Sequence, residues 1–175
     1  INNVKTLFQL ITEESDSIWP YIIRNMYKPL AISFKKVDVI LGNPPWLALQ
    51  FMKNSKYQNY LKNQSKKYNL VDTKNMQNIA HLELATLFFC QCTDNFLKKN
   101  GSILFVMPRS VLISSQHKNF LKFKTPLIQL KKIIDLNDVS PIFKIPSCVL
   151  IAKQGFETKY PITKISFKGN LKSTH

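Results

Sequence analysis

Short apolar runs alternate along this chain with segments whose apolar residues recur at helical spacing. Val37–Leu41 and Ile103–Met107 are short, mostly apolar and contain β-branched residues, which is typical of parallel strands buried on both faces. Gly42–Pro45 follows the first run and Pro108 follows the second, and glycine and proline interrupt regular structure. The pattern therefore predicts two buried strands, each followed by a loop.

Helices are predicted before, between and after these strands. A helix is expected over Ile18–Tyr27, a long amphipathic one over Asn78–Lys99 that ends at Asn100-Gly101, and a shorter one over Ser115–Phe123. The polar, lysine-rich stretch Leu47–Asp72 is expected to be a loop or a loose helix. The apolar positions of the long helix recur at steps of three and four, and they are Leu82, Ala85, Phe89, Cys92 and Phe96.

The last third of the chain reads as further strands. Two are expected near Lys131–Leu136 and Ser147–Lys153, joined by the turn Asn137–Pro146, and the tail from Tyr160 is expected to add another. Alternating strands and helices favour a parallel sheet, whereas two strands joined by a turn pair antiparallel. The fold class is therefore α/β, with a parallel sheet that ends in an antiparallel strand pair.

Composition narrows the class of protein. The chain has 175 residues, 45% of them hydrophobic, which suits one packed domain or a large part of one. Its 25 Lys and Arg residues against 10 Asp and Glu give a net charge of +15, which attracts polyanions such as nucleic acid.

Cysteine, histidine and apolar content exclude other classes. The 3 cysteines do not form a disulfide framework, so we expect a reducing, cytoplasmic location. His81 and His117 are isolated, and no metal site is expected. No apolar stretch approaches the ~20 residues of a membrane-spanning helix, so no membrane partner is expected.

The most informative motif is Asn43-Pro44-Pro45-Trp46, at the carboxyl end of the first predicted strand. Ligands of open α/β sheets bind at that edge. The two prolines restrict the loop, so the Asn43 side-chain oxygen and the Pro44 carbonyl can accept both hydrogens of an exocyclic NH₂ group. These acceptors raise the electron density on the nitrogen as a new bond forms, and Trp46 offers a flat face for a planar base. The motif thus favours methylation of an amine.

This motif resembles the signature of amino-group DNA methyltransferases. The features after it are similar to those of the adenine-N6 class in restriction-modification and phage-defence enzymes: Leu97–Arg109 resembles its helix-turn-strand and Leu136–Ile151 its last hairpin. The resemblance implies a partial Rossmann-like fold that depends on S-adenosylmethionine. It also implies transfer of a methyl group to the N6 amino group of a flipped-out adenine in double-stranded DNA.

The resemblance also implies roles for individual residues. The Asn43–Trp46 loop would be the catalytic segment. Trp46 and Phe143 would stack on the two sides of the adenine. Phe89, with Phe88 as a competing position, would contact the adenine ring of the cofactor, and Asn43 would also lie at the cofactor.

Two parts of the family pattern have no counterpart in this sequence. No glycine precedes position 42, whereas the family has a Gly-rich cofactor loop before the motif. Few residues follow Lys153, where the family has a target-recognition domain. Residues 1–175 are therefore expected to be a partial catalytic domain that does not methylate DNA alone.

Basic residues are candidates for contacts with DNA phosphates. Lysines are interleaved with tyrosines after the motif, and Arg109 follows a strand end; charge neutralisation together with stacking suits unpaired DNA. A solvated basic surface is the other interpretation. The candidates are Lys53, Lys56, Lys62, Lys66, Lys67 and Arg109.

Two alternatives to DNA adenine methylation stay open. The same loop chemistry would serve a methyltransferase that acts on an RNA base or a protein glutamine amide, although the Trp46 platform and the basic charge favour nucleic acid. A non-catalytic DNA-binding remnant of the fold is the second alternative.

Overall fold

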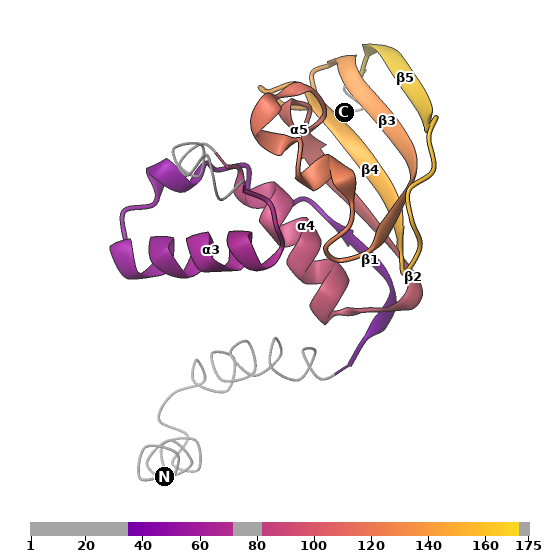
Figure 1. The fold of residues 1–175 in the computed structure, drawn as a ribbon. Helices are drawn as coiled ribbons and strands as arrows, with labels where there is room; N and C mark the ends of the chain where they lie inside the picture. Colours follow the sequence, from indigo (N-terminus) through magenta and orange to yellow (C-terminus); the bar gives the residue numbers. More distant parts are fainter. Residues whose placement is uncertain (1–34, 72–81, 172–175) are drawn as a thin grey trace, which may run out of the picture. The chain divides into compact units, whose positions relative to one another are not determined.

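A five-stranded mixed sheet forms the centre of the described structure. The computed structural model describes residues 35–71 and 82–171, so the helix expected at 18–27 and the start of the one expected at 78–99 lie outside the described residues. The features below belong to the compact unit Val37–His175. In spatial order the strands are β1 (Val37–Gly42), β2 (Leu97–Pro108), β4 (Ser147–Gln154), β3 (Ile128–Ser140) and β5 (Thr163–Asn170) (Figure 1).

The strand pairing confirms the predicted α/β sheet. β1 and β2 are parallel, β4 is antiparallel to both β2 and β3, and β5 joins β3 in parallel. The antiparallel pair and the additional C-terminal strand are therefore both present.

The boundary between the long helix and β2 differs from the prediction. Helix α4 (Leu84–Asn95) ends before Lys99, and β2 begins directly afterwards at Leu97. The reason is pairing with β1, because Val37 pairs with Leu97 and its N–H donates to the Phe96 carbonyl at 2.8 Å. This early pairing overrides the helical pattern of the segment.

Two other helix predictions were incomplete or wrong. The stretch expected to be a loop or a loose helix contains a regular one, α3 (Ser55–Lys67), whose N-cap Asn54 accepts a hydrogen bond from the Tyr57 N–H at 3.1 Å. The helix expected at 115–123 is absent; the segment instead forms two short 3₁₀ turns, η3 (Ser115–His117) and η4 (Phe120–Lys122).

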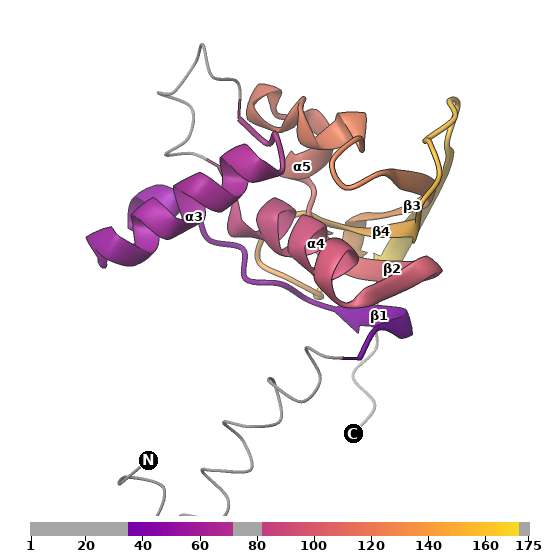
Figure 2. The ribbon, with the colours of Figure 1, turned by 60° about the horizontal axis from the view of Figure 1, so that its bottom comes forward.

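Helices cover one face of the sheet. Helix α4, the short helix α5 (Ser110–Ile113) and the turns after it lie on the same side (Figures 1 and 2). Phe89 of α4 packs edge-on against Phe105 of β2 at 5.7 Å and against Phe120 of η4 at 5.5 Å. No helix within the described segments is long and apolar enough to cross a membrane.

The expectation that β1 is buried on both faces is wrong, because its side chains on the face opposite the helices are exposed. Val39 is 54% exposed and Leu41 is 71% exposed. They are in register with Ser102 and Leu104 of β2, on the face opposite the Phe105 side chain. No described helix packs on that face. Within residues 35–71 and 82–171, the apolar side chains of β1 on this face are therefore not covered.

Candidate functional site

The Asn43–Trp46 loop follows β1 at the carboxyl edge of the parallel β1–β2 pair. A Cβ on Gly42 would lie 2.8 Å from Cε1 of Phe105, so only glycine lets β1 end this close to the core. Pro44 is buried and anchors the loop. Asn43 is exposed, and its side chain makes no hydrogen bond to another described residue. The amide oxygen of Asn43 is therefore available to a ligand.

Trp46 is held in place by strand β2. Its indole Nε1 donates a hydrogen bond to the Val106 carbonyl at 3.2 Å, and the half-buried ring packs against the core. Because one edge of the indole is fixed in this way, the orientation of its flat face is set by the sheet.

Phe143 lies against Trp46. The ring centroids are 4.9 Å apart and the planes are tilted by 54°. For a base to stack between the two rings, the rings must be roughly 7 Å apart, which is twice a contact distance of roughly 3.5 Å. The structure therefore brings the two residues together but leaves no gap for a base, and the sandwich requires the rings to separate.

Phe89 does not fit the cofactor role expected for it. Its side chain is 0% exposed and is enclosed by Phe105 and Phe120, so no ligand can reach it in this structure. Phe88 is only partly buried. Of the two neighbouring positions, Phe88 is the one available to a cofactor and Phe89 is a core residue.

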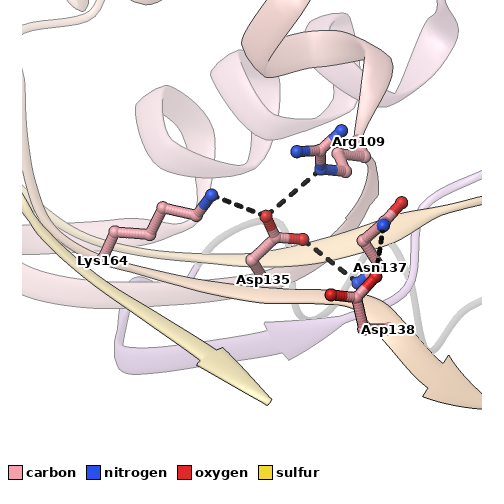
Figure 3. A network of polar contacts seen from close by, with 5 residues as sticks. All are labelled: Arg109, Asp135, Asn137, Asp138 and Lys164. Atoms are coloured by element: carbon pink, nitrogen blue, oxygen red, sulfur yellow. Dashed lines mark hydrogen bonds and ion pairs between the residues drawn. The ribbon is translucent and has the colours of Figure 1, made fainter. Parts of the chain in front are cut away.

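An ion-pair network joins the end of β2 to β3 and β5 (Figure 3). The buried Asp135 carboxylate of β3 accepts hydrogen bonds from Arg109 Nε at 3.2 Å, Lys164 Nζ at 2.7 Å and the Asn137 N–H at 3.1 Å. Burial acts to raise the pKa of Asp135, but the hydrogen bonds from Lys164, Asn137 and Arg109 outweigh it and hold this pKa below its usual range. Arg109, a candidate for DNA contact, thus has part of its charge engaged within the protein.

We expect Asp135→Asn to destabilise the fold by about 1–3 kcal/mol at pH 7, because hydrogen bonds to a charged group are lost. The lowered pKa means that the stabilisation is fully present above the unfolded pKa of about 3.9 and is lost as pH falls through the folded value. The difference between variant and wild type should therefore shrink below about pH 4. Urea unfolding across a pH series measures it.

Asp38→Asn is the matched control for this prediction. Asp38 also pairs with a lysine, Lys98 at 2.9 Å, but its side chain is 78% exposed. Exposed ion pairs contribute only about 0–1 kcal/mol. Equal losses in the two variants would show that the Asp135 network is no more than a surface ion pair.

The predicted basic residues lie mostly on α3. Lys53, Lys56 and Lys66 are exposed. Lys62 Nζ donates to Gln58 Oε1 at 3.5 Å and Lys67 Nζ lies 3.7 Å from Asp94, so these two lysines are partly engaged.

Aromatic side chains accompany the lysines of α3. The exposed rings of Tyr57 and Tyr60 stack on each other at 6.2 Å with an angle of 14°. The Tyr68 hydroxyl, beyond the helix, donates to Asp94 Oδ2 of α4 at 3.0 Å, and burial followed by the Asp94 charge raises the pKa of Tyr68. Helix α3 therefore presents basic and aromatic groups while Tyr68 anchors its end.

Two acidic residues beside the site had no assigned role in the sequence. They are Asp135 and Glu83, which accept hydrogen bonds from Arg109 and Ser110. Glu83 is the only acidic residue between Asp72 and Asp94 and directly precedes α4. That isolation is the one signal in the sequence that could have drawn attention to it.

Comparisons with solved structures show the fold. A protein of Listeria monocytogenes described as a class I S-adenosylmethionine-dependent methyltransferase matches 77% of this chain with a TM-score of 0.56 and 16% identity, over 38% of its own length. DrdV, solved by electron cryomicroscopy with DNA, matches 82% of this chain with a TM-score of 0.56 and 20% identity, over 16% of its length. The Type ISP restriction-modification enzyme LlaGI, solved as a nuclease-deletion mutant with a DNA substrate mimic, matches 93% with a TM-score of 0.55 and 14% identity, over 17% of its length.

The chain thus has the class I S-adenosylmethionine-dependent methyltransferase fold and spans well under half the length of each of these proteins. None of the curated proteins compared with it matches. The family model of the Eco57I restriction-modification methylases matches residues 2–143, from before β1 to Phe143 in the candidate site. This chain belongs to the Eco57I restriction-modification methylase family.

Proposed function

We propose that this chain supplies the base-binding part of a cytoplasmic restriction-modification enzyme. The complete enzyme transfers a methyl group from S-adenosylmethionine to the N6 amino group of a flipped-out adenine in double-stranded DNA. The observation that carries the proposal is the exposed, unengaged Asn43 amide, on a proline-braced loop beside the Trp46–Phe143 ring pair.

The loop acts on the amino group through hydrogen bonds. The Asn43 side-chain oxygen and the Pro44 carbonyl accept the two N6 hydrogens, which localises the lone pair on nitrogen as it attacks the methyl carbon. When bound, S-adenosylmethionine would supply this methyl group as an electrophile: its sulfur–methyl bond would break as the nitrogen–methyl bond forms, S-adenosylhomocysteine would leave, and the nitrogen would release one proton to solvent. Such acceptors stabilise the charge that develops in the transition state more than they stabilise the neutral amine.

The described residues account for only part of a cofactor site. Asn43 and Phe88 are the accessible candidates, and the glycines within residues 35–71 and 82–171 do not form a Gly-rich loop. The role proposed for the described residues is to hold and orient the base.

The base enters after Phe143 moves away from Trp46. Phe143 is 42% exposed and lies in the loop between β3 and β4, whereas Trp46 is fixed to Val106 by its indole N–H. Phe143 is thus the member of the pair that can move without breaking a hydrogen bond. Each ring then stacks on one face of the base, at about 1–3 kcal/mol per contact.

Helix α3 is proposed to contact the DNA backbone. If Lys56 and Lys66 lie against phosphates, replacing both by Ala should reduce the slope of log affinity against log salt by roughly 1 for each contact. The measurement is a DNA-binding titration of the full-length protein at several salt concentrations. Lys99→Ala is the control, because Lys99 is exposed near the amino end of β2, at the other end of that strand from the Asn43 loop. If the slope is unchanged in the double variant, α3 does not contact the DNA backbone.

The proposal is tested by identifying the methylated product. Full-length protein and S-adenosylmethionine are incubated with plasmid DNA, with structured RNA and with a glutamine-containing peptide, and the products are analysed by mass spectrometry. N6-methyladenine in DNA is expected. N4-methylcytosine, methylated RNA or methylglutamine would replace the assigned substrate, and no methyl transfer at all would favour the non-catalytic remnant.

A further inference from the structure

Arg109, directly after β2, holds both sides of the loop that carries Phe143. Its backbone N–H donates to the Pro146 carbonyl at 2.8 Å, where that loop ends. Its Nε donates to Asp135 Oδ2 at 3.2 Å, in the strand that leads into the loop (Figure 3). Arg109 therefore fixes the position of the Phe143 loop relative to the end of β2.

The next residue, Ser110, reaches the other aromatic residue of the site through Glu83. Ser110 Oγ donates to Glu83 Oε1 at 2.6 Å. The backbone beside Glu83 pairs with the residues that follow Trp46: Leu84 N–H donates to the Leu47 carbonyl at 2.9 Å, and Glu83 forms an antiparallel bridge with Ala48. Ser110 thereby connects the end of β2 to the segment that carries Trp46.

The Glu83 side chain makes this connection rather than capping its helix. Glu83 occupies the N-cap position of α4, yet its side chain forms no capping hydrogen bond. The carboxylate is only 17% exposed; its Oε1 lies 3.8 Å from Nε2 of the fully buried His117, and its Oε2 has no hydrogen-bond partner among the described residues. The bond from Ser110 is thus the short contact that orients a largely buried charge, and hydrogen bonds to charged groups are the stronger ones.

Arg109 and Ser110 together bridge the two aromatic loops from consecutive positions. One step runs from Ser110 through Glu83 to the segment after Trp46, and the other runs from Arg109 to Pro146 at the end of the Phe143 loop. The Ser110–Glu83 contact thus ties the segment after Trp46 to the end of β2, in addition to the hydrogen bond from the Trp46 indole to Val106.

We propose that Ser110 and Glu83 are positioning residues that set the separation of Trp46 from Phe143 and hence the entry of the flipped base. This inference rests on the proposed function. It assigns to the two residues no contact with the base or with the cofactor.

The test compares Ser110→Ala with Ser115→Ala, an exposed serine of η3, in the full-length protein. The recognised sequence is first read from the N6-methyladenine pattern that wild-type protein leaves on a plasmid. The target adenine is then replaced by 2-aminopurine, whose fluorescence rises when it is unstacked. For Ser110→Ala we expect a reduced fluorescence rise and a kcat lowered about 10- to 100-fold, since small misplacements have effects of this size. The Kd for DNA should stay near the wild-type value, and any fall in the unfolding temperature should be no larger than the loss of one hydrogen bond causes.

Two further variants separate positioning from a purely structural role. Ser110→Thr keeps the hydroxyl and should restore the fluorescence rise, and Glu83→Gln keeps an acceptor oxygen and should lose less than Ser110→Ala. If Ser110→Ala also lowers the unfolding temperature, recovery of base extrusion in Ser110→Thr decides in favour of the proposal and failure to recover decides against it.

Wild-type kcat and fluorescence in Ser110→Ala, or equal effects of Ser110→Ala and Ser115→Ala, would overturn the positioning role. Wild-type protein that leaves no N6-methyladenine on any DNA would instead overturn the proposed function.

Discussion

Replacing Asn43 by Ala is expected to lower kcat for methyl transfer about 10²- to 10³-fold, the usual loss when one preorganised hydrogen-bonding group of a transition state is removed. The side chain is exposed and makes no hydrogen bond to another described residue, so the variant should fold normally. DNA affinity should change little, because the bond to the amino group matters most while charge develops on the nitrogen. Single-turnover methylation of DNA measures the rate of the chemical step.

Lys99→Ala is also the control for this substitution. Lys99 is exposed near the amino end of β2, at the other end of that strand from the Asn43 loop, and its removal should leave kcat unchanged. An Asn43→Ala variant with at least half of the wild-type kcat would show that the amide is not an acceptor for the amino group. The proposed chemistry of the loop would then be wrong even if the protein methylates DNA.

Replacing Phe89 by Ala should destabilise the fold by about 3–5 kcal/mol, the usual cost of truncating a buried phenylalanine. The ring is 0% exposed and contacts Phe105 and Phe120 edge-on, so its loss leaves a cavity between α4, β2 and η4. Urea unfolding monitored by circular dichroism measures the change.

Phe88→Ala gives the complementary result. Because Phe88 is partly exposed, we expect a smaller loss of stability and an increase of about tenfold in Kd for S-adenosylmethionine, the loss of one stacking contact. Calorimetric titration of the full-length protein with the cofactor measures it. A Phe88→Ala variant that binds the cofactor as wild type does would leave neither phenylalanine with a cofactor role.

The sheet could be predicted because its signals are local. Apolar runs bounded by proline mark β1 and β2, and the turn after Ser140 separates two apolar runs that pair antiparallel. Helix α3 lacked such a signal, since Leu61 and Ser65 are its only buried residues, and contacts distant in sequence support it, such as the Gln58 side chain on the Leu49 carbonyl. The open face of β1 could not be predicted, because apolar residues look alike whether or not another element covers them.

In the candidate site, too, residues in short motifs could be predicted, whereas contacts between residues distant in sequence could not. Short motifs make Asn43, Trp46 and Phe143 candidates, and the structure brings the two aromatic residues into contact. Phe89 was misassigned because Phe88 and Phe89 are adjacent and a one-residue difference on a helix turns a side chain by about 100°. The partners of Glu83 and Asp135 could not be foreseen, since each pairs with residues brought close only by the sheet.

Under the proposed function, the contact between Trp46 and Phe143 opposes the capture of any flipped base. An aromatic pair contributes about 0.5–1.5 kcal/mol beyond its buried area, so parting the rings weakens the capture of every base by up to about tenfold. This penalty is the same for purines and pyrimidines and cannot by itself select adenine. An adenine opposite a mismatched partner has already lost its pairing energy, and such a heteroduplex should be captured more tightly than the fully paired sequence.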